Sequence, residues 1–118
     1  MLIISQEQYK RLEQDAMDRQ AREIGRRFAS EIQAIDPQLA GQVLAYVNST
    51  NIEFLDRLLS LTTIEQHQQF LLFLFVQTGV DIFNEPEFGY ILEHPLLSGN
   101  AKARHIALSA YSISARGT

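Results

Sequence analysis

Three histidines are the first side chains to consider for metal binding: His67, His94 and His105. A zinc or di-iron site in a helical protein uses ligands three or four residues apart on one helix face, for example as Glu-x-x-His. None of these histidines has a carboxylate or a second histidine at that spacing. We therefore expect structural or surface histidines and no metal site around them.

Three carboxylates, Asp81, Glu85 and Glu87, form the next candidate, because calcium prefers oxygen ligands. The segment lacks the loop length and the glycine position of an EF-hand, so we predict no calcium site. Nucleophilic catalysis has no better support, since the chain has no cysteine, no glycine-flanked serine elbow and no acid placed to orient a histidine. Its glycines stand singly, without a phosphate-binding loop. The sequence thus predicts a protein that is not an enzyme and uses no cofactor.

The same acidic segment contains aromatic residues, and this combination is typical of protein interfaces. No basic residue lies between Asp81 and Glu93, and mutual repulsion among acids is commonly relieved by a basic partner. The sequence therefore predicts a partner-binding face made of Asp81, Phe83, Glu85, Glu87 and Tyr90. The alternative is that the aromatic residues of this segment only pack against the core.

Length and composition limit the remaining functions. A chain of 118 residues, 46% of them hydrophobic, fits a single domain that we expect to span residues 1–118. The net charge of −4 argues against nucleic-acid binding, which relies on clustered Lys and Arg. The lack of cysteine suits a reducing compartment, and the first residues lack the basic and apolar regions of a signal peptide. We therefore expect a cytoplasmic protein.

The element that must support the predicted face is an apolar segment that ends at Gly79. Thr62 and Glu65 have the spacing of a capping box, which predicts a helix start, and Gly79 suits a left-handed helix end. Residues 70–76 are apolar on every side, so a helix over about residues 63–78 must be buried on every side. The run is much shorter than the ~20 residues that a bilayer requires. We predict a buried central helix and no membrane insertion.

A long helix is predicted before this segment. Ser5 and Gln8 form another capping-box pair, and apolar residues recur at helical spacing up to Ile35. This pattern predicts one helix over about residues 6–34. Most of its arginines follow an acid by four residues, so we interpret them as a solvated, paired face and not as an anion site.

A second helix is predicted from Asp36, which suits an N-cap, and Pro37, which suits the first helical position. Its apolar spacing favours a single helix to about Ser60. The polar residues 48–51 compete with a helix for backbone hydrogen bonds, so a kink or break there is an open alternative.

Two further helices are predicted at the end of the chain, the first of them short. Asn84 and Glu87 have capping-box spacing, which indicates a helix over about residues 85–93, before Pro95. A last helix follows over about residues 98–115. The fold class is therefore all-α: a single-domain bundle of about five helices around the buried helix over about residues 63–78.

Residues 62–102 carry an ordered set of short motifs, made of Thr62, Phe70, Leu71, Phe73, Gly79, Asp81, Pro86, Ile91, Leu92, Pro95, Leu97, Ser98 and Lys102. In this order they resemble small bacterial proteins encoded beside type VI secretion spike, tip or polymorphic toxin genes. Those proteins carry a capped Thr or Ser, an apolar aromatic-rich helix, Gly-x-Asp-Phe and a proline. Ile-Leu, a second proline, Leu-Ser and a lysine-bearing last helix follow. Ile82 stands where the family has Phe.

The resemblance implies a non-enzymatic adaptor or chaperone that binds a secreted effector or a spike component in the producing cell. It supplies no catalytic residues. An immunity protein that neutralises a cognate toxin is the alternative function, and a small-ligand-binding helical domain is the third. The length of the first helix also leaves open a homodimer that pairs through it.

Overall fold

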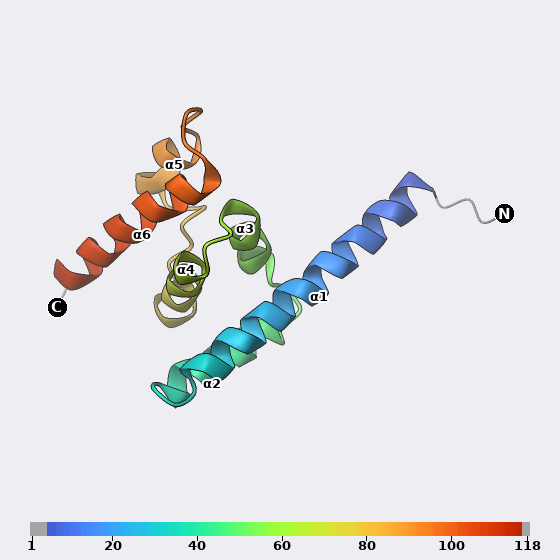
Figure 1. The fold of residues 1–118 in the computed structure, drawn as a ribbon, viewed down its shortest axis with the longest axis horizontal. Helices are drawn as coiled ribbons and strands as arrows, with labels where there is room; N and C mark the ends of the chain where they lie inside the picture. Colours follow the sequence, from blue (N-terminus) through green and yellow to red (C-terminus); the bar gives the residue numbers. More distant parts are fainter. Residues whose placement is uncertain (1–4, 117–118) are drawn as a thin grey trace. The chain divides into compact units, whose positions relative to one another are not determined.

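The computed structural model describes the backbone of residues 5–116 and the side chains of residues 5–111. All regular secondary structure in this range is helical, so the predicted all-α class is confirmed. The helices are α1 (Gln6–Ile32), α2 (Pro37–Val47), α3 (Glu53–Leu61), α4 (Glu65–Thr78), α5 (Pro86–Leu92) and α6 (Gly99–Arg116) (Figure 1). Over the described residues, no helix is both long enough and apolar enough to cross a membrane.

The chain divides into two compact units, Met1–Ile52 and Glu53–Thr118. The first unit contains α1 and α2, and the second contains α3 to α6. The single domain over residues 1–118 stays a prediction.

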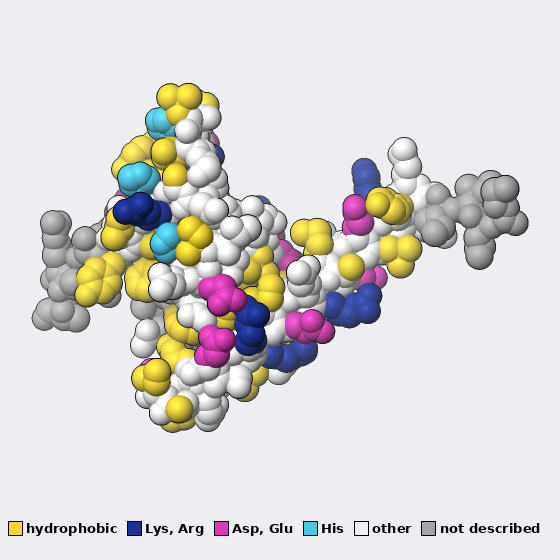
Figure 2. All heavy atoms as spheres, viewed as in Figure 1, with side chains coloured by type: hydrophobic (Ala, Val, Ile, Leu, Met, Phe, Trp, Pro, Cys, Tyr) yellow, Lys and Arg dark blue, Asp and Glu magenta, His cyan; other side chains and the backbone are white. Residues whose placement is uncertain are grey.

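The first unit is a helical hairpin. The predicted caps are confirmed: Ser5 and Gln8 form a capping box at the start of α1, and Asp36 Oδ1 accepts a hydrogen bond from the Leu39 amide at 3.0 Å. The helix α1 packs against α2. All of its buried residues lie in its second half, and most are small, which allows close approach: Ala21, Gly25, Phe28 and Ala29. Figure 2 shows hydrophobic side chains among charged ones along the first half of α1, at the right of the view.

Residues 48–52 separate α2 from α3, so the prediction of a single helix over about residues 36–60 is wrong. The Ser49 hydroxyl donates to a carbonyl of the last turn of α2 at 2.6 Å. Arg22 Nη1 donates to the Val47 carbonyl at 2.6 Å and to the Ser49 carbonyl at 2.7 Å. These side chains form hydrogen bonds with carbonyl groups that would accept backbone hydrogen bonds if the helix continued. The break raises the number of helices in the described range from about five to six.

The second unit packs α6 against α3, α4 and α5, and α3 also packs against α4. Its large, fully buried apolar side chains come from α3, α4, α6 and the connection after α4: Leu55, Leu58, Leu71, Leu72, Ile82 and Ile106. Within the apolar run 70–76 only Leu71 and Leu72 are buried and the other five residues are half-buried, so the prediction of a helix buried on every side is wrong, because one side of α4 is only partly covered. Gly79 has φ 78°, so the predicted left-handed end of α4 is confirmed.

The start of α4 differs from the prediction. Its N-cap is Ile64, which forms no side-chain cap, so the predicted capping box of Thr62 and Glu65 is wrong. The Thr62 hydroxyl instead donates to Asn100 Oδ1 at 2.8 Å, and Gln68 Nε2 donates to the Thr62 carbonyl at 2.7 Å. The connection between α3 and α4 is therefore held by residues of α6 and α4.

Candidate protein-binding pocket

The connection from α4 to α5 is folded around Asp81. Its Oδ1 atom accepts a hydrogen bond from the Phe83 amide at 2.9 Å, and its Oδ2 atom accepts one from Asn84 Nδ2 at 2.8 Å. The predicted N-cap at Asn84 is wrong, because the cap position of α5 is Glu85 and no side chain caps it. Asp81 is half-buried and uses its carboxylate to hold the turn.

Phe83 is part of an aromatic cluster inside the second unit. Its ring meets the ring of Phe54 edge-on, with 5.7 Å between the centroids, and Phe54 stacks on Phe75 at 4.1 Å. The guanidinium carbon of Arg57 lies 5.8 Å from the centroid of the Phe83 ring. Phe83 is half-buried by these contacts, so its main role is packing.

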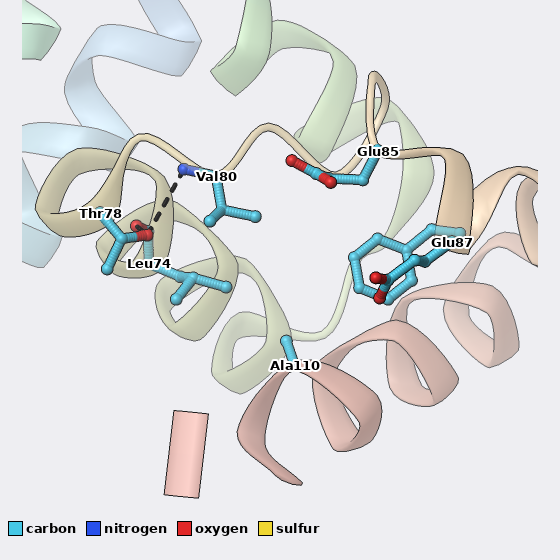
Figure 3. A pocket seen from close by; sticks show the side chains of 7 residues that line it. Leu74, Thr78, Val80, Glu85, Glu87 and Ala110 are labelled. Atoms are coloured by element: carbon cyan, nitrogen blue, oxygen red, sulfur yellow. Dashed lines mark hydrogen bonds between the residues drawn. The ribbon is translucent and has the colours of Figure 1, made fainter. Parts of the chain in front are cut away.

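Glu85 and Glu87 line a pocket of about 270 Å³ in the second unit. The other lining residues are mainly apolar: Leu74, Thr78, Val80, Phe88 and Ala110. Figure 3 shows the two glutamates across the pocket from Leu74 and Val80, with Ala110 of α6 at the lower edge. Four parts of the chain therefore meet here: α4, the connection after it, α5 and α6.

The two carboxylates are the charged groups of this pocket, and neither has an ion-pair partner among residues 5–111. Phe88 is only 4% exposed, so its ring forms a wall. Glu85 is half-buried and Glu87 is exposed, which puts negative charge at the rim. Such a pocket suits a group with an apolar body and a positive end, as in the side chain of Lys or Arg.

Tyr90 does not line this pocket, but it lies on the same helix as Glu87 and is 72% exposed. Of the five residues predicted for the partner-binding face, the structure brings Glu85 and Glu87 together at one pocket. It gives Asp81 and Phe83 contacts within the fold and leaves Tyr90 at the surface.

Sequence reasoning missed the apolar walls of the pocket. Leu74 and Thr78 are one turn apart on α4, which indicates a shared face, but Val80 and Ala110 are far apart in the sequence. Val80 and Ala110 line the same pocket because α6 packs against the other helices of the second unit.

The three histidines lie on different parts of the second unit: His67 on α4, His94 after α5 and His105 on α6. His94 Nδ1 accepts a hydrogen bond from the Leu96 amide at 3.2 Å, and His105 is exposed. His67 Nδ1 is buried and has no hydrogen-bond partner among the described residues. Within the described range, no group of three or more His, Cys, Asp and Glu side chains is arranged to hold a metal ion.

Comparison of the chain with protein-family models, with curated proteins and with solved structures found no match.

Proposed function

We propose that the protein is a non-enzymatic accessory factor that binds another protein through the pocket at Glu85 and Glu87. Its partner is a secreted effector or a spike component of a bacterial type VI secretion system, for which it acts as an adaptor or chaperone in the cytoplasm. The observation that carries the binding role is the pair of carboxylates at the rim of a mainly apolar pocket, neither of which has an ion-pair partner among residues 5–111. The secretion role rests on the resemblance of residues 62–102.

In this proposal the partner inserts a Lys or Arg side chain. The aliphatic stem contacts Leu74, Val80 and Phe88, while the cationic end pairs with Glu85 and Glu87. The exposed ring of Tyr90 adds aromatic contact on the same helix, of the kind that often dominates binding energy. Asp81 and Phe83 act indirectly, because they hold the turn that carries Glu85.

The test is recovery of effectors and spike proteins encoded beside the gene, with wild-type protein and the double variant Glu85→Lys/Glu87→Lys as baits. Charge reversal should slow association and reduce recovery at least about tenfold, since complementary charge mainly sets the association rate. Tyr90→Ala should chiefly speed dissociation. A matched control is Glu23→Lys/Glu93→Lys, which changes the net charge equally at exposed glutamates that do not line the pocket.

Equal recovery by the folded pocket variant and the control would refute this binding site. The biological role is tested separately. Delivery of the effector should fall when the gene for this protein is deleted. If the protein instead allows cells that produce a cognate toxin to survive, it belongs to the immunity class.

A further inference from the structure

The first half of α1 carries an apolar stripe that the structure leaves uncovered. Tyr9 is 59% exposed, Leu12 57% and Met17 47%. At 3.6 residues per turn, Tyr9 and Leu12 lie more than a quarter of a turn around the helix from the buried residues Ala21 and Phe28, whereas Met17 lies close to their side. Tyr9 and Leu12 are therefore not on the side that packs in the first unit, and they need a separate partner to be buried.

One acid lies within this stripe. Glu13 is four residues after Tyr9 and four before Met17, so its side chain lies between them on the helix surface. Glu13 is exposed and has no ion-pair partner within residues 5–111. A partner for the stripe must therefore combine apolar contacts with a central positive charge.

The second unit contains a surface with this chemistry. A groove of about 550 Å³ is lined by Ile64, Asn100, Ala101, Arg104, His105 and Leu108. Ile64 is 40% exposed and Leu108 is 58% exposed, although both are large apolar residues. Arg104 lies three residues after Ala101 and four before Leu108, which puts a cation at the centre of the row.

The apolar row on α6 continues one turn beyond Leu108. Tyr111 is 66% exposed, and its ring lies 6.4 Å from the ring of Phe70 on α4. From Ala101 to Tyr111 the row is about 15 Å long, and from Tyr9 to Met17 the stripe of α1 is about 12 Å long, at 1.5 Å per residue. The two rows are similar in length and in apolar character, and each carries one charge of opposite sign: Glu13 at the middle of the α1 stripe and Arg104 three residues from the Ala101 end of the α6 row.

We propose that the first half of α1 of one copy binds in the groove between the start of α4 and α6 of a second copy. Tyr9, Leu12 and Met17 cover Ile64, Leu108 and Tyr111, and Glu13 pairs with Arg104. Binding of an amphipathic helix in an apolar groove is a common mode of recognition. This self-association uses a surface separate from the pocket at Glu85 and Glu87, so it does not depend on the proposed function.

The contact joins two different surfaces. Two copies form a closed dimer if the α1 of each binds the groove of the other, and copies form longer chains if binding runs in one direction only. One such contact is smaller than a standard protein interface, so we expect micromolar affinity. Wild-type protein should change from monomer to larger species between about 1 μM and 1 mM in sedimentation or light-scattering measurements.

Two charge reversals provide the decisive test. Glu13→Arg and Arg104→Glu each create a like-charge pair in the contact, so each variant alone should associate at least about tenfold more weakly than wild type. An equimolar mixture of the two variants restores an opposite-charge pair in both directions and should associate again. The matched control is Glu7→Arg, which lies on the opposite side of α1 from the stripe.

Recovery of association in the mixture, with both single variants monomeric and helical by circular dichroism, would establish the contact. Three results would overturn it: wild-type protein that stays monomeric at 1 mM (~13 mg/ml, from its mass of 13.4 kDa), a mixture that stays monomeric, or loss of association in Glu13→Arg while Arg104→Glu associates as wild type does. The last result would indicate pairing of α1 with α1.

Discussion

Asn100, the second residue of α6, holds the turn between α3 and α4 through Thr62. The Thr62 hydroxyl donates to Asn100 Oδ1 at 2.8 Å, although the two residues are 38 positions apart. The Thr63 amide donates to the same oxygen at 2.8 Å, and Asn100 Nδ2 donates to the Thr63 hydroxyl at 3.2 Å. Thr62 is only 1% exposed, so water cannot easily replace Asn100 as its partner.

Asn100→Ala should therefore lower the free energy of unfolding by about 1 to 3 kcal/mol, because it leaves a buried hydroxyl without its acceptor. Asn100→Asp is the matched control, since it keeps an oxygen for Thr62 and Thr63 and places a negative charge in the first turn of α6. Urea unfolding of the three proteins measures the difference. Equal loss of stability in both variants would show that the shared acceptor oxygen is not the important feature.

Gly99 is required because the backbone of Leu61 lies directly against it. A Cβ atom at this position would overlap with the Leu61 carbonyl oxygen, and a backbone atom cannot turn aside as a flexible side chain can. We expect Gly99→Ala to lower the melting temperature by several degrees, which corresponds to a loss of about 1 to 3 kcal/mol.

Gly41→Ala provides the control, since a Cβ there meets no atom within 4 Å and alanine favours the interior of α2. It should leave stability unchanged or raise it by up to about 1 kcal/mol. A melting temperature that responds equally to both substitutions would contradict the close packing of α6 against the end of α3.

Arg22 fixes the break after α2. Its Nη1 atom bonds the carbonyls of Val47 and Ser49, and Arg26 donates from Nη2 to Asn48 Oδ1 at 3.3 Å. Arg22→Ala should cost about 1 to 3 kcal/mol, the range for hydrogen bonds from a charged donor to partly buried acceptors. Hydrogen exchange of the amides of residues 48–52 should accelerate, whereas exposed Arg19→Ala should leave it unchanged. An unaltered exchange rate in Arg22→Ala would mean that the break forms without this arginine.

Leu72, and not its neighbour Phe73, should be the more sensitive position of α4. Leu72 is fully buried, whereas Phe73 is half-buried. Leu72→Ala should lower the free energy of unfolding by about 2 to 5 kcal/mol, the usual cost of a cavity in a core. Phe73→Ala should cost less despite its larger side chain. Chemical denaturation ranks the two variants, and the opposite order would mean that the Phe73 ring is the better packed of the two.

Helix ends whose hydrogen bonds close within one turn could be predicted from the sequence. Ser5 with Gln8, Asp36 with the Leu39 amide and the left-handed Gly79 were all predictable, because each depends on residues at most four positions away. The all-α class was predictable for the same reason, since apolar spacing along one helix is a local property.

The same local patterns fail where packing supplies another partner. Thr62 has the spacing of a cap, but its hydroxyl donates to Asn100 of α6, 38 positions away. Arg22 likewise turns to carbonyls 25 and 27 positions away and helps end α2. A buried or partly buried polar group forms a hydrogen bond with the partner that packing places nearest to it. The identity of that partner cannot be predicted from spacing in the sequence.

Some features of the candidate pocket could be predicted from the sequence, and others could not. The acids and aromatic residues between Asp81 and Tyr90 could be recognised from their types, since charge and ring surface belong to the side chains themselves. Their different roles follow from the contacts of the folded chain. Asp81 holds the turn, Phe83 packs its ring, and Glu85 lines the pocket. The walls of a pocket come from helices distant in the sequence, and only the packing of α6 brings Ala110 beside Leu74 and Val80.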